Sequence, residues 1–187
     1  SLTGTWMQQI AMSWLVYRLT GSVFLLATVT FMAQIPILLV TPLMSVFVDR
    51  FDRQKILILT QSLSMVQALS MAVLTLSGVI EVWHILILSL LIGCINALDN
   101  PTRQAFYPSL VAKEHLSNAI ALNSAVINGS RLIGPAVGGV LIGIFGEGLC
   151  FLLNGISYLG VIIAFYRSAP PAECAHRYTR RFLLCVR

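Results

Sequence analysis

Hydrophobic residues along this chain gather into long runs, which short polar segments separate. Each run is roughly 15–28 residues long, and none alternates polar and apolar positions as the strands of a membrane β-barrel do. About 20 apolar residues form a helix that crosses the hydrocarbon core of a bilayer. The pattern therefore predicts six membrane-spanning helices, over residues 2–19, 23–48, 56–76, 84–98, 118–145 and 149–166.

Composition excludes most alternatives to a membrane protein. Of the 187 residues, 57% are hydrophobic and 10% are charged, whereas about 25% of residues are charged in an ordinary soluble domain. A soluble fold of this size would have too few polar residues to cover its surface. No run alternates basic and aromatic residues, so nucleic acid is not an expected partner. The expected fold class is an all-α integral membrane protein, with the lipid bilayer as its surroundings.

Neither a metal site nor another cofactor is expected. The four cysteines form no Cys-x-x-Cys pair, and Cys94 and Cys150 lie in apolar runs, where a thiol behaves as a small hydrophobic group. The three histidines show no metal-ligand spacing. The sequence also differs from that of an intramembrane serine protease, which needs a Gly-x-Ser turn and a buried histidine. Here Gly129 directly precedes Ser130, and no histidine lies in the middle of a run. We therefore expect no enzymatic activity.

Basic residues near the helix ends predict the orientation of the chain. Arg18 is alone on one side, and Arg131 lies within the fifth run. The other ten of the twelve lie on the opposite side: Arg50, Arg53, Lys55, Arg103, Lys113, Arg167, Arg177, Arg180, Arg181 and Arg187. Cytoplasmic loops carry the excess of Lys and Arg. Residues 49–55 and 99–117 and both chain ends are therefore expected in the cytoplasm.

The runs also form a weak internal repeat. Runs one to three and four to six are two triplets, which have opposite topology because three is odd. Proline interrupts the middle run of each triplet, at Pro36 and Pro42 in the second run and at Pro135 in the fifth. Paired interruptions of this kind indicate a transporter built from a 3+3 inverted repeat. Prolines are also common in membrane helices without such a role.

Charged residues of both signs follow the second run. This cluster and the small residue before it are Ser45, Asp49, Arg50, Asp52, Arg53 and Lys55. Such a group can form different ion pairs in different states of a protein that rocks, and so act as a cytoplasmic gate. Asp99 and Arg103, at the end of the fourth run, could pair with Arg50 or Asp49, or could be solvated at the interface. An ordinary positive loop would explain the basic residues but not the aspartates.

Small residues share one face of the fifth helix. Ser130, Gly134 and Gly138 recur every four positions, and Gly139 extends the face, while Pro135 bends the helix. Such a face lets another helix approach closely. One alternative is that it serves packing within these six helices.

Arg131 and a set of amides are further candidates. A charge at mid-bilayer costs about 2.5–3.5 kcal/mol, so Arg131 should face the interior or water. It would serve an anionic substrate or coupling, or it would bind a structural partner such as a carbonyl freed by Pro135. Uncharged amides could line a cavity, although each alone is more often an interhelical hydrogen bond. These amides are Gln8, Gln9, Gln34, Asn96, Asn123 and Asn128.

Both motifs resemble signatures of the major facilitator superfamily. Asp49, Arg50 and Arg53 match the loop 2–3 signature G-x-x-x-D-R-x-G-R-[RK], with Ser45 and Asp52 in the glycine positions and Gln54 in place of a basic residue. Residues 130–139 resemble the helix-5 antiporter signature G-x-x-x-G-P-x-x-G-G, with Ser130 in the first glycine position. Longer stretches are similar to the enterobactin-exporter-like branch, the transmembrane secretion effectors, over residues 4–9, 14–22, 99–106 and 118–124.

The resemblance implies a proton-coupled exporter of a siderophore-like or drug-like molecule in a bacterial inner membrane. It covers residues 3–166, the first six of the usual twelve helices, and so implies a missing C-terminal six-helix half as partner. In that family the glycine face of helix 5 seals against the second half. We expect residues 1–166 to form the bundle and residues 167–187 an unrelated, truncated or frameshifted cytoplasmic tail. A non-transporting remnant or scaffold, or a half-transporter that needs a second subunit, is the alternative.

Overall fold

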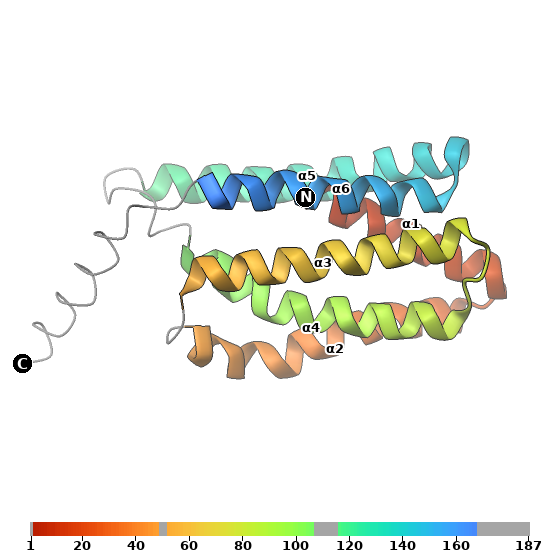
Figure 1. The fold of residues 1–187 in the computed structure, drawn as a ribbon, viewed down its shortest axis with the longest axis horizontal. Coiled ribbons are helices and arrows are strands. Elements are labelled where there is room, and N and C mark those ends of the chain that lie inside the picture. The colour runs from red at the N-terminus through yellow and green to blue at the C-terminus, as the bar shows by residue number, and fades with distance from the viewer. Residues whose placement is uncertain (1, 49–51, 107–115, 168–187) are drawn as a thin grey trace, which may run out of the picture.

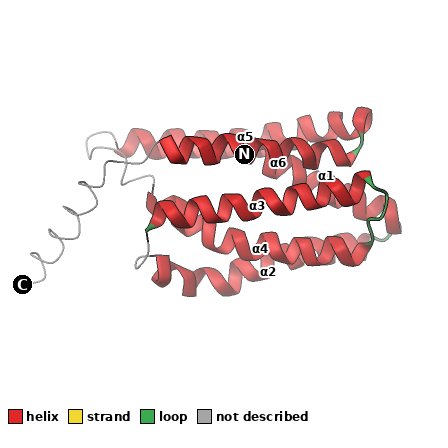
Figure 2. Cartoon of the chain, viewed as in Figure 1, coloured by secondary structure: helices red, strands yellow, loops and turns green. Residues whose placement is uncertain are grey.

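The computed structural model describes residues 2–48, 52–106 and 116–167, and within these ranges it contains helices joined by short turns and no strand (Figures 1 and 2). The helices are α1 (Leu2–Thr20), α2 (Val23–Val48), α3 (Arg53–Leu76), α4 (Val82–Phe106), α5 (Leu116–Phe145) and α6 (Glu147–Arg167). The predicted all-α fold is thus confirmed. Helices α1 and α5 are each followed directly by a glycine with a positive φ, Gly21 (62°) and Gly146 (81°). This left-handed conformation stops a helix at little cost only in glycine.

Helix α4 is longer than predicted. The sequence pattern ended the fourth helix at residue 98, yet α4 continues through Pro101 to Phe106. The proline removes one backbone donor, but neighbouring side chains stabilise this turn. Thr102 Oγ1 donates to the carbonyl of Leu98 at 2.6 Å, and Arg103 pairs with Asp99 one turn earlier. Helix α3 also begins earlier than predicted, at Arg53, because the Asp52 side chain caps it.

The helices pair in a way that repeats between the two halves of the bundle. The most extensive contacts join α2 to α4, α3 to α6 and α1 to α5, followed by α3 to α4 and α1 to α6. Exchanging helices 1–3 with 4–6 converts the α2–α4 pair into the α5–α1 pair, and the α3–α4 pair into the α6–α1 pair. The α3–α6 pair converts into itself (Figure 1). The described helices therefore have the arrangement expected of a 3+3 inverted repeat.

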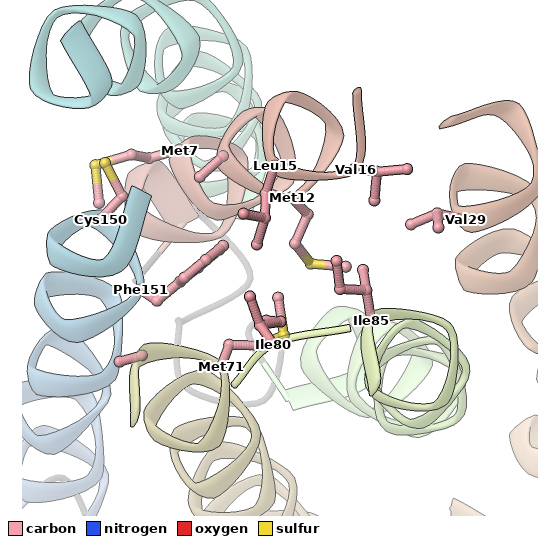
Figure 3. Close-up of a cluster of buried hydrophobic side chains, with 12 residues drawn as sticks. Met7, Met12, Leu15, Val16, Val29, Met71, Ile80, Ile85, Cys150 and Phe151 are labelled. Atoms are coloured by element: carbon pink, nitrogen blue, oxygen red, sulfur yellow. The ribbon is translucent and has the colours of Figure 1, made fainter. Parts of the chain in front are cut away.

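A hydrophobic cluster joins α1, α3, α4 and α6. Leu15, Met71, Ile85 and Phe151 are fully buried at its centre, and Figure 3 shows how their side chains meet between the helices. At the same end of the bundle Arg18 reaches Glu147 across the α1–α6 contact, with 3.3 Å between Nη1 and Oε2. The carboxylate of Glu147 is buried. These contacts fix the first helix of the chain against the last.

Five of the six described helices, α2 to α6, are long and apolar enough to cross a membrane. Helix α1, which we also predicted to span the membrane, is not among them, because its composition is too polar. Its polar residues include Gln8, Gln9 and Ser13, which line a cavity between the helices. By contrast, α2 exposes Phe24, Phe31 and other large apolar side chains to its surroundings. An apolar exterior of this kind suits lipid rather than water.

Candidate functional site

A cavity of about 400 Å³ lies among the six described helices. Five of the six predicted amides line it: Gln8, Gln9, Gln34, Asn96 and Asn123. Asn128 does not; it is exposed, and its Nδ2 donates to the carbonyl of Ser124. The reason is helical periodicity, because Asn123 and Ile127 lie one turn apart on the cavity face and Asn128 is rotated about 100° from Ile127.

A chain of buried amides crosses the bundle beside the cavity. Asn154 Nδ2 on α6 donates to Gln8 Oε1 on α1 at 2.5 Å, and Gln8 Nε2 donates to Gln67 Oε1 on α3 at 2.8 Å. Gln67 Nε2 in turn donates to the carbonyl of Leu88 on α4. Both hydrogen-bonding ends of Gln8 are thus occupied by protein. Sequence reasoning missed Gln67 and Asn154, although a lone amide within an apolar run is the same signal that identified Gln8.

Asp99 is the centre of a buried polar cluster. It is 6% exposed, so the alternative that Asp99 is solvated at the interface is wrong. One carboxylate oxygen accepts from Thr60 Oγ1 and Gln61 Nε2, both at 2.8 Å. The other accepts from Arg103, at 3.1 Å from Nε and 2.8 Å from Nη2. Asp99, Gln61 and Arg103 all line the cavity.

The described partners of Asp99 lie on α3 and α4. Asp99 and Arg103 pair with each other, because positions four apart lie on one face of α4. Asp49 and Arg50 lie outside the described residues, and their pairing stays a prediction. Sequence reasoning also missed Thr60 and Gln61, because nothing in the sequence sets the rotation of α3 against α4.

The described part of the loop 2–3 motif connects the ends of three helices. Asp52 Oδ1 accepts from the backbone N–H of Gln54 and caps α3. Arg53 Nη1 donates to the carbonyl of Ala105 in the last turn of α4, at 3.1 Å. Gln54 Nε2 donates to the carbonyl of Phe165 near the end of α6, at 2.8 Å. These contacts join the ends of α4 and α6 through the start of α3.

Lys55, another member of the motif, takes no comparable part. Lys55 is exposed and lies 3.9 Å from the Asp52 carboxylate, a weak surface pair. Ser45 lies in the C-terminal part of α2. Phe106 and Phe165 pack edge to face at the same end of the bundle, with their ring centroids 5.9 Å apart.

The small-residue face of α5 packs against α1. A Cβ on Gly134 would lie 2.6 Å from Trp6 Cβ, and one on Gly138 would lie 3.0 Å from Met7 Cγ. Thr3 Oγ1 donates to Ser130 Oγ at 3.2 Å. The family resemblance implied that this face seals against a second half, but Ser130, Gly134 and Gly138 are buried within the described bundle. The packing alternative is therefore correct for them.

Other members of the helix-5 motif are still open to a partner. A Cβ on Gly139 would meet nothing within 4 Å, and Gly139 is exposed, because it lies about 100° around α5 from Gly138. Pro135, next to Gly134, is half-buried. Contact between this side of α5 and a second half therefore stays a prediction.

Arg131 lies against an aromatic ring. Its guanidinium carbon is 4.9 Å from the centroid of Trp6, a distance at which a cation–π interaction stabilises both groups. Trp6 itself lines the cavity, while Arg131 is exposed. The structural partner of Arg131 is thus an aromatic ring rather than a backbone carbonyl freed by Pro135.

No group of three His, Cys, Asp or Glu residues that could hold a metal ion occurs in the part of the chain that the structure describes. The cavity instead offers amides, hydroxyls, aromatic rings and one internal ion pair. This set of groups can hydrogen-bond and surround a molecule, but it includes no arrangement of nucleophile and base within the described lining.

Comparison with known proteins follows this geometry. The sequence profile of the transmembrane secretion effector family matches residues 1–186, and so continues past Tyr166, where we expected the likeness to end. The boundary there stays a prediction, since residues 168–187 lie outside the described part of the structure. No solved structure matches.

Several transporters are similar to the chain. It is 32% identical to the Staphyloferrin A transporter of Staphylococcus aureus over 86% of its own length and 41% of that protein. It is 26% identical to Macrolide efflux protein A of Streptococcus pyogenes, over 83% of the chain and 38% of that protein. Multidrug efflux pump Tap of Mycolicibacterium fortuitum is 25% identical, over 73% of the chain and 35% of that protein. The chain thus spans about two fifths of the length of these relatives.

Proposed function

Because this chain belongs to the transmembrane secretion effector family of major facilitator transporters, we propose that it forms the N-terminal half of an exporter that moves a small amphiphilic molecule by alternating access. A second six-helix half would complete the substrate site, which in such folds lies between the two halves. The proposed location is the inner membrane of a bacterial cell, with both ends of this chain in the cytoplasm. The relatives are transporters rather than enzymes.

The observation that carries this proposal is the cavity of about 400 Å³, whose lining includes both apolar and amide side chains. Ligand sites are typically apolar with a few polar groups that fix orientation. Here Trp6, Ile37 and Ile92 supply apolar surface, and Gln9 and Asn96 supply hydrogen-bonding groups. Such a lining suits an amphiphilic molecule better than an inorganic ion.

The contacts at the ends of α3, α4 and α6 support a gate on the side that we assign to the cytoplasm. Arg53 and Gln54 join those helix ends through carbonyl groups, and Asp99 and Arg103, near the end of α4, line the cavity. Helices joined in this way move as a unit when one half rocks against the other. Asp49 and Arg50 would contribute further ion pairs from the loop.

We also propose that export is coupled to proton entry. Asp99 supplies the one carboxylate among the described residues of the cavity lining, so it is the candidate for carrying the proton. Asp99 is buried and accepts four hydrogen bonds, so it is not a solvated surface group. Proton binding to Asp99 would weaken its pairing with Arg103 and so couple protonation to the helix ends.

The direct test is transport by the protein expressed from its complete reading frame and reconstituted in inside-out proteoliposomes. We expect erythromycin or staphyloferrin A to accumulate when the lumen is acidic, and accumulation to stop when nigericin collapses the pH gradient. Vesicles without protein serve as the control. Accumulation that ignores nigericin would contradict proton coupling, and no accumulation of either compound would contradict the proposed exporter.

A further inference from the structure

Arg131 continues the face of α5 that lines the cavity. Helix α5 contributes Asn123 and Ile127, four positions apart, to the described lining. Arg131 follows four positions after Ile127, so it lies on the same face of the helix, one turn farther along. Long side chains in a helix lean back toward its N-terminus, which directs Arg131 toward the turn that holds Ile127.

The contact with Trp6 places the charge of Arg131 beside the cavity. The guanidinium carbon lies 4.9 Å from the centroid of the Trp6 ring, and Trp6 lines the cavity from α1. An aromatic face attracts a cation and so holds it in position, but the cation keeps its charge. Arg131 is exposed, so a molecule in the cavity could reach it.

The charge of Arg131 has no counter-ion among the described residues. No described carboxylate forms an ion pair with Arg131, and no described acceptor takes a hydrogen bond from it. Arg103, which lines the same cavity, differs because Asp99 lies 2.8 Å from its Nη2. Asp99 and Arg103 therefore contribute no net charge to the cavity, whereas Arg131 adds one positive charge beside it.

A carboxylate is the group that fits such a guanidinium best. The planar fork of N–H donors in arginine matches the two oxygens of a carboxylate, and charged hydrogen bonds of this kind are strong. A charged side chain within a membrane-spanning segment is unfavourable unless it finds a partner, which a bound carboxylate would supply. A cationic ligand would instead be repelled.

We propose that Arg131, held in place by Trp6, is a subsite that binds a carboxylate of the exported molecule. This inference rests on the proposed export function and adds the substrate class: amphiphiles that carry a carboxylate, in preference to neutral or cationic ones. The apolar and amide side chains of the cavity would surround the uncharged part of the same molecule.

The first test compares two chemically matched probes on the full-length protein in proteoliposomes. Staphyloferrin A carries carboxylates, and its fully methyl-esterified form has the same skeleton without them. We expect the acid to be exported with an apparent KM roughly tenfold lower than that of the ester, the effect of one charged hydrogen-bonded contact. An ester KM equal to that of the acid, or below it, would overturn the subsite.

The second test repeats this comparison in variants. Arg131→Gln removes the charge and keeps a polar side chain, so we expect the acid to lose its advantage over the ester. Arg131→Lys keeps the charge without the planar fork and should retain part of that advantage. Arg167→Gln is the matched control, because it removes an exposed arginine at the end of α6 that lies outside the described cavity lining. It should leave the ratio of the two KM values within roughly twofold.

The outcomes separate this inference from the function on which it rests. An Arg131→Gln variant that raises both KM values equally would assign the effect to packing, and an equal loss of the acid's advantage in Arg167→Gln would assign it to general charge. Either result would overturn the subsite. If Arg131→Gln does not fold, Arg131→Lys and the comparison of acid with ester decide.

Erythromycin, which has no carboxylate, serves as the third probe. Export of erythromycin without export of staphyloferrin A would overturn the subsite and leave the exporter intact. Export of none of the three probes would overturn the proposed function, and the subsite with it.

Discussion

Asn154 and Gln8, 146 positions apart in the sequence, share a buried hydrogen bond of 2.5 Å between Nδ2 and Oε1. This bond joins α6 to α1 and continues through Gln67 to α4. Because Gln8 lines the cavity while its amide is bonded to protein at both ends, its role is to hold the cavity wall in place.

Asn154→Ala is expected to lower the free energy of unfolding by about 1–3 kcal/mol, because it leaves Gln8 Oε1 buried without a donor. Asn128→Ala is the control, since Asn128 is exposed and bonds only to its own helix among the described contacts. The measurement is the melting temperature of the full-length protein in detergent micelles. Equal melting temperatures for the two variants would contradict the importance of the amide chain.

Gly134→Ala is expected to destabilise the protein by about 1–3 kcal/mol relative to Gly139→Ala, through overpacking. The new methyl group would lie 2.6 Å from Trp6 Cβ and 2.9 Å from the carbonyl oxygen of Thr3, whereas the one at Gly139 would meet nothing within 4 Å. Both variants gain the same helix propensity. Their difference in melting temperature therefore measures the α1–α5 contact, and no difference would show that α1 does not pack there.

Asp99→Asn is expected to cost roughly 3 kcal/mol, because it replaces the carboxylate that pairs with the Arg103 guanidinium by a neutral amide in a site that is largely closed to water. The side chains of Asp99 and Arg103 are 9% and 15% exposed. Asp52→Asn makes the same chemical change where the side chain is 56% exposed, and asparagine caps a helix as well as aspartate does. A similar loss of melting temperature in both variants would refute the buried pair. Export coupled to protons should also cease in Asp99→Asn alone.

Arg53→Ala is expected to destabilise the protein by about 1.5–3 kcal/mol, the value of a hydrogen bond from a charged group. It removes the contact with the carbonyl of Ala105 that ties α3 to α4. Lys55→Ala removes a basic residue two positions later that is 83% exposed, so it should change the melting temperature little. If both variants lost the same stability, general loop charge rather than this contact would be the cause.

How far the site could be predicted differs between its parts. Amides within apolar runs were found from the sequence, because a polar group in a membrane helix must meet a polar partner or a cavity. Five of those six amides do line the cavity, and Asn128 fails only by its rotation on α5. The partners of Asp99 could not be predicted in the same way. The choice between Arg103, Arg50 and solvent depends on how deep the end of α4 lies beside α3.

The sequence by itself determined the all-helical membrane class, the family and the rough limits of the helices, because these follow from the length and periodicity of apolar runs and from local motifs. Only the tertiary structure decided which face of α5 packs on α1, and that Asp99 bonds to Thr60 and Gln61. The physical reason is that helix rotation and depth depend on side-chain packing between helices distant in sequence, which no local pattern records.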